Sequence, residues 1–189
     1  TAYAIANVII IPMTGFLAQY FGRKNYYLYS IVIFTLASIM CGNSTTLWEL
    51  VFWRFVQGIG GGALLSTSQS ILFDTFPPQQ RGIASAMFGV GIVMGPTLGP
   101  TLGGLIIDNY AWPLIFNINI PFGILAGVLT YFFIEDSVHH TTKPSIDWIG
   151  IMLLATGIGS LQYVLERGEA NDWFADRSIQ IFAIRKEYR

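Results

Sequence analysis

An arginine and a glutamine one helical turn apart are the residues of this sequence best placed to do chemistry. Arg54 lies deep within an apolar run, and Gln57 follows three residues later. A charge inside lipid costs several kcal/mol by most estimates and marks an ion or substrate pathway by default. The alternative is a structural arginine that satisfies a broken backbone. The helical period places one set of residues on a single face, with Glu49 nearly opposite: Arg54, Gln57, Gly58, Gly61, Leu65 and Ser68.

Glycine and proline repeat along a later apolar run at helical spacing. Small residues at every fourth position remove side chains from one stripe and let a neighbouring helix pack closely. Pro96 and Pro100 each remove a backbone donor and bend a helix. A packing seam needs only the glycines, as in the weaker pair Gly123 and Gly127, so the paired prolines indicate more than packing. The stripe consists of Gly91, Gly95, Pro96, Gly99, Pro100, Gly103 and Gly104.

A third set of residues surrounds the first gap between apolar runs: Gly15, Leu17, Gly22, Arg23 and Lys24. Gly15 would let two helices approach each other, and Gly22 would allow a tight reversal of the chain. The two cations would fix this gap on the cytoplasmic side of a membrane. Any membrane hairpin with a positively charged inner loop would fit the same description.

Composition indicates that membrane-spanning helices carry these residues. The 189 residues are 53% hydrophobic and 11% charged, whereas soluble domains average about 25% charged residues. The net charge of −1 excludes a basic nucleic-acid-binding protein, and the high apolar content excludes a disordered one. Cys41 is the single cysteine, which excludes a disulfide scaffold.

Six apolar runs approach the length of about 20 residues that a helix needs to cross a bilayer. They cover residues 2–18, 26–42, 47–73, 83–107, 112–134 and 146–165. The sequence therefore predicts an all-α, polytopic membrane protein with about six transmembrane helices. Arginine and lysine occur in the first, third and fifth gaps and are absent from the second and fourth, which places the odd gaps on the cytoplasmic side. Residues 166–189 read as a polar loop and a truncated tail, and we interpret the chain as a fragment.

Taken together, the three sets of residues resemble motifs of the Major Facilitator Superfamily. The first gap resembles its G-x-L-A-D-R-x-G-R-K signature, with Gln19 and Tyr20 at the Asp-Arg positions. The run from Leu50 through Arg54 to Gly60 resembles the fourth-helix motif, in which the arginine faces the transport path. The glycine-proline stripe resembles the antiporter motif, in the doubled form of drug:proton antiporters with fourteen spans.

Two further stretches resemble the EmrB/QacA-like subfamily of these multidrug efflux transporters. Residues 112–123 resemble the stretch that opens its sixth helix, with Pro113 in place of an arginine. Residues 147–174 resemble its seventh helix and the loop after it. The resemblance maps the six runs onto helices two to seven of fourteen, so that residues 1–165 form part of the N-terminal bundle and one linking helix.

The resemblance implies a secondary transporter that exports drugs or other lipophilic small molecules in exchange for protons, across the inner or plasma membrane of a bacterial cell. Arg54, Gln57, Gly58 and Gly61 would then line the transport cavity or take part in proton coupling. The implied partners are the solute, protons, the bilayer, a periplasmic adaptor and an outer-membrane channel, with no nucleic acid. No cofactor or metal is expected, because the neighbouring histidines at 139 and 140 lack partners at ligand spacing.

Two alternatives stay open at this point. A truncated, non-transporting remnant is one, because a single helical bundle has no second bundle to rock against. An intramembrane enzyme is the other, since Ser66, Ser68 and Ser70 lie near glycines in an apolar run. That chemistry needs a base within hydrogen-bond reach of the serine, and no histidine lies within any of the six runs.

Overall fold

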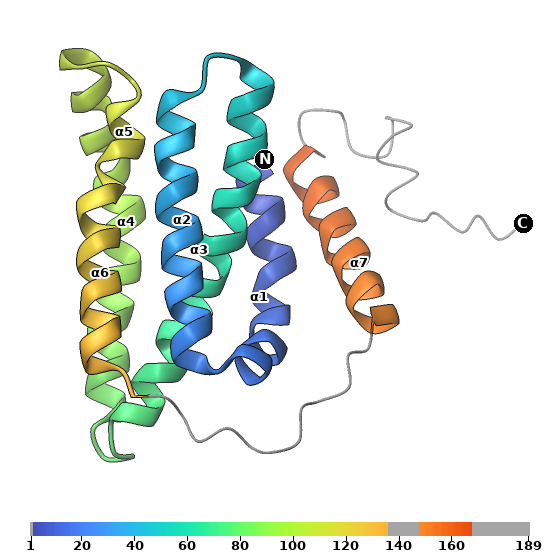
Figure 1. The fold of residues 1–189 in the computed structure, drawn as a ribbon, viewed down its shortest axis with the longest axis vertical. Coiled ribbons are helices and arrows are strands. Elements are labelled where there is room, and N and C mark those ends of the chain that lie inside the picture. Colours follow the sequence, from blue (N-terminus) through green and yellow to red (C-terminus); the bar gives the residue numbers. More distant parts are fainter. Residues whose placement is uncertain (1, 136–147, 168–189) are drawn as a thin grey trace, which may run out of the picture.

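The fold is a bundle of helices, seen in a computed structural model that describes residues 2–135 and 148–167. No strand occurs within these residues, so the predicted all-α fold is confirmed. The helices, in chain order, are α1 (Ala2–Phe21), α2 (Arg23–Asn43), α3 (Leu47–Thr75), α4 (Arg81–Asn109), α5 (Leu114–Asn117), α6 (Asn119–Phe133) and α7 (Trp148–Arg167) (Figure 1).

The helix α3 occupies the middle of the bundle. It packs along α1 on one side and along α2 on the other, while α6 packs on the far side of α2 and α7 lies against α1 (Figure 1). Its glycines permit this close packing. A Cβ added at Gly60 would lie 2.8 Å from both the backbone nitrogen of Phe34 and the carbonyl oxygen of Ser30, so α2 approaches α3 backbone to backbone.

The fifth apolar run does not form one uninterrupted helix. The structure divides it into α5 and α6 around Ile118. Pro121 has no N–H to donate to the carbonyl of Asn117, four residues earlier, and the interruption falls next to this missing bond. The sequence-based boundaries at 112 and 134 did not include this break. It places Asn119 at the start of α6, on the side facing α2.

Apolar side chains cover the outside of the bundle, and small or polar side chains fill its inside. Leu36 and Val32 on α2 and Phe132 on α6 are exposed, whereas Ala63 and Thr67 on α3 are buried. This distribution is the reverse of that in a soluble protein, and it is the one that helices packing in lipid adopt. It supports the membrane assignment made from the composition.

Four of the described helical stretches are long and apolar enough to cross a membrane: Ala2–Phe21, Arg23–Asn43, Arg81–Asn109 and Leu114–Phe133. The apolar part of α7, Met152–Leu165, is shorter. The central helix α3 is not among the four, and it is the helix that carries Arg54 and Gln57. The helix that carries the intramembrane arginine is thus the one packed between α1 and α2.

Positive charges gather at the end of the bundle where α2 and α4 begin. Arg23 at the start of α2 forms an ion pair with Asp74 near the end of α3. The ammonium of Lys24 lies 5.5 Å from the centre of the Tyr131 ring, near the end of α6. Arg81 begins α4 at the same end (Figure 1). Under the positive-inside rule this end faces the cytoplasm.

An N-cap and a carboxylate bond to the residue before it begin the central helix. The Thr46 hydroxyl oxygen accepts a hydrogen bond from the backbone N–H of Glu49 at 3.2 Å, and the Glu49 carboxylate accepts one from the backbone N–H of Thr45 at 3.0 Å. This satisfies two donors at the helix N-terminus and places a negative charge where the helix dipole favours it. Glu49 is therefore engaged at the end of α3 and is not a partner of Arg54.

We predict that Thr46→Ala destabilises the protein by about 1 kcal/mol, because Ala cannot accept the N-cap hydrogen bond. Thermal unfolding in detergent, followed by circular dichroism, measures this. Thr75→Ala is the matched control, because the Thr75 hydroxyl only donates to a carbonyl of its own helix. Equal midpoints for the two variants would contradict the assignment of Thr46 as the cap.

Candidate functional site

The guanidinium of the half-buried Arg54 lies between two aromatic rings of neighbouring helices. Its central carbon is 4.8 Å from the centre of the Phe116 ring, on α5, and 5.6 Å from the centre of the Tyr3 ring, on α1. Both rings present the apolar, electron-rich surface that attracts a cation in a water-poor site. Among the described residues no carboxylate pairs with Arg54, so the rings and one amide are its partners.

Gln57 links Arg54 to the helices on the other side of α3. Its side-chain oxygen accepts a hydrogen bond from Nη1 of Arg54 at 3.2 Å. Its amide nitrogen donates to the hydroxyl oxygen of Ser38, on α2, at 2.5 Å. Gln57 is 2% exposed and Ser38 is fully buried, so these polar groups depend on one another for hydrogen bonding.

The predicted single face of α3 is divided between two neighbouring helices. Gln57 points to α2, whereas Gly58 and Gly61 meet α1. A Cβ on Gly58 would lie 2.5 Å from the carbonyl oxygen of Tyr3 and 2.7 Å from Cβ of Ala6. A Cβ on Gly61 would lie 2.6 Å from the Tyr3 hydroxyl. In the structure both glycines serve close packing against the helix that carries Tyr3.

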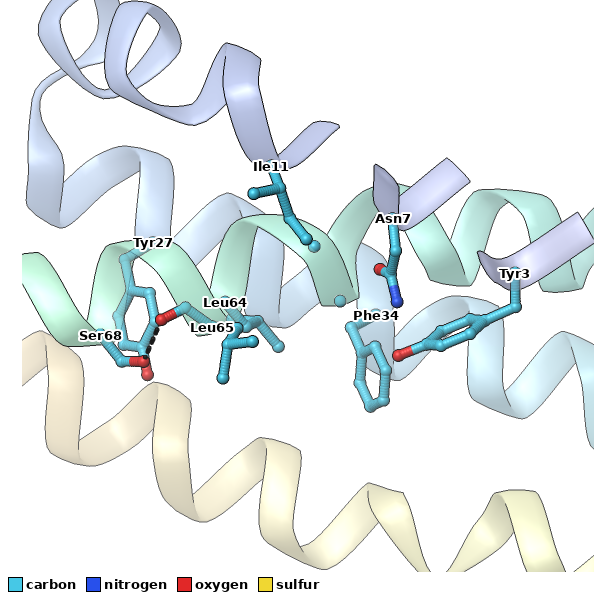
Figure 2. Close-up of a pocket in the computed structure, with 10 residues that line it drawn as sticks. Tyr3, Asn7, Ile11, Tyr27, Phe34, Leu64, Leu65 and Ser68 are labelled. Atoms are coloured by element: carbon cyan, nitrogen blue, oxygen red, sulfur yellow. Dashed lines mark hydrogen bonds between the residues drawn. The ribbon is translucent and has the colours of Figure 1, made fainter. Parts of the chain in front are cut away.

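An open cavity of about 390 Å³ lies between α1, α2 and α3, and Figure 2 shows the residues that line it. The Tyr27 and Ser68 hydroxyls are hydrogen-bonded to each other at one end. Asn7 and Tyr3 lie at the other end, and the Asn7 side-chain oxygen is buried without a partner among the described residues. The remaining lining comes from Ile11, Phe34, Gly61, Gly62, Leu64 and Leu65. The cavity is therefore aromatic and aliphatic, with hydroxyl and amide groups at its ends.

Sequence reasoning assigned no role to the aromatic residues of this region. Tyr3 and Phe34 belong to apolar runs that contain many aromatic residues, and nothing in their spacing marks them. Phe116 lies in the stretch at residues 112–123 that resembles the efflux subfamily, but its contact with Arg54 was not predicted. Asn7 is the residue of this region that the sequence could have indicated. Placing an amide side chain in a membrane costs free energy unless the amide is hydrogen-bonded, so an asparagine in an apolar run suggests a functional site.

The first-gap residues meet at the junction of α1 and α2. Gly22 has a φ of 83°, in the left-handed region that favours glycine, and the chain reverses there. Leu17 packs against a buried cluster of Ala18, Tyr26 and Ala63. Gly15 faces open space, with nothing within 4 Å of an added Cβ among the described residues. The expected close approach of two helices at Gly15 is therefore not part of this structure.

The glycine-proline stripe of α4 is not in contact with a neighbouring helix in the described part of the chain. Added Cβ atoms at Gly91, Gly95, Gly99, Gly103 and Gly104 would meet nothing within 4 Å. The helix continues without interruption through Pro96 and Pro100. The expectation of a closely packed seam is not met within this structure, and the role of the stripe stays a prediction.

The glycine pair expected to be the weaker seam is the one in close contact. A Cβ on Gly123 of α6 would overlap the side chain of Thr35 on α2, and one on Gly127 would lie 3.8 Å from Ile31. The sequence indicated that the α4 stripe would pack more closely than the α6 pair, and the structure shows the opposite among the described residues. Glycine spacing indicates that a helix could approach closely, but it does not say whether a neighbouring helix is there.

The serines near the glycines of α3 have no base beside them among the described residues. Ser66 donates to the Gly62 carbonyl of its own helix, and Ser68 bonds Tyr27 and the Leu65 carbonyl. In the same part of the chain, no group of histidine, cysteine and acidic side chains is arranged to hold a metal. His139 and His140 lie outside the described residues.

Comparison with known proteins matches residues 1–183 to the family described as Major Facilitator Superfamily. The chain is 41% identical over 184 residues to the "Multidrug export protein EmrB" of Escherichia coli strain K12. It is 38% identical over 179 residues to the "Fatty acid resistance protein FarB" of Neisseria gonorrhoeae, and 37% identical over 184 residues to the "Multidrug resistance protein 3" of Bacillus subtilis strain 168.

These alignments cover nearly all of the chain and a minor part of each relative. They include 97%, 95% and 97% of this chain, but 36%, 35% and 36% of the relatives. The chain thus spans about a third of the length of these proteins. The resemblance to an efflux subfamily drawn from the motifs is confirmed by these matches.

We predict that the stability of this chain responds to one glycine seam and not to the other. Gly123→Leu should lower its unfolding temperature, because the side chain would overlap Thr35 and overpacking costs about 1–3 kcal/mol. Gly95→Leu, the same substitution at an open position, should leave the unfolding temperature close to that of the wild type. Thermal unfolding of residues 1–189 in detergent tests both. Equal losses in the two variants would show that the described packing is not what holds the chain together.

Proposed function

The chain belongs to the Major Facilitator Superfamily, and from that premise we propose that it forms most of the first helical bundle and one linking helix of a proton-coupled exporter. The exporter would move drug-like or other lipophilic small molecules across the inner or plasma membrane of a bacterial cell. Two bundles that rock around a midplane site are the usual basis of alternating access. The observation that carries the proposal is the lone guanidinium of Arg54 inside the bundle.

A guanidinium at this position is costly unless it has a function. Two aromatic rings and one amide lower the cost of burial, but no carboxylate among the described residues neutralises the charge. Ionisable groups within membrane helices that face a bundle interior or a cavity mark solute and proton pathways. We assign Arg54 to the wall of the transport pathway, with Gln57 as its closest polar neighbour.

The adjacent cavity supports a small, lipophilic solute. Its volume of about 390 Å³ lies within the range of about 300–1,000 Å³ for drug-sized ligand sites. Its walls are mainly aromatic and aliphatic, and Asn7 and Tyr27 supply hydrogen-bonding groups at opposite ends. The relatives' names refer to multidrug export and fatty acid resistance, and solutes of either kind are largely apolar.

Proton coupling in this proposal needs a carboxylate within the membrane. None of the described helices has an acidic residue near its middle. Glu49, Asp74 and Asp108 all lie near helix ends. We therefore assign the protonated carboxylate to a part of the transporter outside these residues. In the same way, we propose that a helix outside them covers the glycine-proline stripe of α4. We further propose that a periplasmic adaptor and an outer-membrane channel receive the solute in cells with two membranes.

The remnant hypothesis is distinguished from this proposal by an efflux assay. Vesicles or cells that contain a full-length transporter carrying this segment should expel a lipophilic dye, and a protonophore should abolish the efflux. Absence of efflux from such a protein, after correct insertion, would favour the remnant. Efflux driven by ATP alone would contradict the proton-coupled mechanism.

We predict that Arg54→Ala in this full-length transporter reduces dye efflux by at least about tenfold, since an interaction made in the rate-limiting step changes the rate tenfold for each 1.4 kcal/mol. Insertion should be unchanged, because removal of a charge favours the membrane-embedded state. Gln69→Ala is the control, because Gln69 is an exposed polar residue of the same helix. Wild-type efflux from correctly inserted Arg54→Ala protein would remove the basis of the proposal.

We also predict that Gly95→Leu abolishes efflux from the full-length transporter while its amount in the membrane stays normal. A large side chain on the stripe would keep a covering helix at a distance. Met94→Leu, a neighbouring exposed position of α4, is the control and should be tolerated. Drug resistance at the wild-type level in cells with Gly95→Leu would leave the stripe without a role.

A further inference from the structure

We propose that Ser38 and Asn119 are positioning residues that hold the Arg54 guanidinium in its transport-competent orientation through Gln57. The inference rests on the proposed function, because it gives Arg54 a role in export. It adds Ser38, which lies in no motif, and it gives a role to Asn119, which lies within the subfamily stretch at residues 112–123 but had none assigned to it. The geometry joins α3, α2 and α6 by a continuous chain of side-chain hydrogen bonds.

The direction of each bond in this chain is set by chemistry. Arginine can only donate hydrogen bonds, so the Gln57 oxygen must face Arg54, and its NH₂ group must then face Ser38. The Ser38 oxygen accepts from Gln57 at 2.5 Å and from the Asn119 amide at 3.4 Å. If Ser38 could not accept, the Gln57 amide would either lose a buried bond or turn over and present its donors to the cation.

Ser38 differs in this respect from the other hydroxyl residues of α2. Ser30 donates to the carbonyl of Tyr26 at 2.7 Å, and Thr35 donates to the carbonyl of Ile31 at 2.8 Å. Such bonds to the preceding turn are the usual way for hydroxyl side chains to be satisfied within a helix. Ser38 instead receives bonds from two other helices, 19 residues ahead and 81 residues ahead in the chain.

The α5–α6 segment is connected to Arg54 in two ways, one direct and one through other side chains. Phe116 on α5 stacks its ring over the guanidinium, and Asn119 at the start of α6 reaches the same group through Ser38 and Gln57. The interruption between α5 and α6 falls between these two residues. A displacement of this segment would therefore change both the ring over the cation and the amide beside it.

Substitution of Ser38 tests the proposal in the full-length transporter that carries this segment. Ser38→Ala removes the acceptor and should lower dye efflux per inserted molecule about tenfold, the cost of one unsatisfied buried donor. Ser38→Cys keeps the shape of the side chain with a slightly larger atom that is only a weak acceptor, and should lose a similar factor. Ser30→Ala is the matched control, since it removes a buried hydroxyl from the same helix without touching the chain of bonds. Efflux should then stay near the wild-type rate.

A double-mutant cycle with Gln57 separates positioning from a general loss of packing. Gln57→Leu breaks the connection, so Ser38→Ala should cause no further loss of efflux in that background. If Ser38 and Gln57 acted only through the general stability of the protein, the fold-losses of efflux in the two single variants would multiply in the double variant. Multiplying effects would overturn the proposal, and so would wild-type efflux from both Ser38→Ala and Ser38→Cys. Should Ser38→Ala fail to insert, the cycle is built with Ser38→Cys instead.

Substitution of Asn119 tests the second proposed positioning residue by the same efflux assay. Asn119→Leu should lower efflux less than Ser38→Ala does, because its bond is longer and Gln57 retains its acceptor. It should also show no further effect in the Gln57→Leu background. Wild-type efflux from Asn119→Leu would remove Asn119 from the proposal. Failure of the proposed function itself is recognised separately, by wild-type efflux from Arg54→Ala.

Discussion

The cost of placing one guanidinium in lipid is the constraint on which the rest of this structure depends. A charged side chain in the apolar part of a membrane must find polar or aromatic partners within the protein. Arg54 finds Gln57 on its own helix, Tyr3 on α1 and Phe116 on α5. Two of these partners come from other helices, so the guanidinium is sheltered only when α1 and α5 lie beside α3.

The glycines of α3 make this assembly possible. Gly58 and Gly60 bring the backbones of α1 and α2 within van der Waals contact of α3, on opposite sides. Short side-chain hydrogen bonds, such as the one from Gln57 to Ser38, need such close approach. The glycine-rich sequence after Arg54 is therefore explained by close packing around a polar interior.

Residue type alone identified part of this arrangement. Arg54 and Gln57 stand out because charged and amide groups are rare in apolar runs, and the hydropathy of the chain predicted the all-α membrane fold. Ser38, Tyr3 and Phe116 could not be found in this way, because their importance comes from contacts between helices. A serine in an apolar run normally bonds its own helix, and only the packing of α2 on α3 makes Ser38 an acceptor for Gln57.

The two glycine seams also show that sequence patterns do not determine which helices are in contact. The strongest pattern in the sequence, on α4, lies beside open space in the described residues, while the weak pair on α6 is closely packed against α2. Closely packed glycines hold two helices in one fixed arrangement, whereas an open stripe of small residues can meet a partner that arrives and leaves. An exporter that alternates between two states needs both kinds of surface. In the exporter proposed above, the helices α1, α2, α3 and α6 would form the fixed unit around Arg54, and α4 would offer the open face against which another part of the transporter moves.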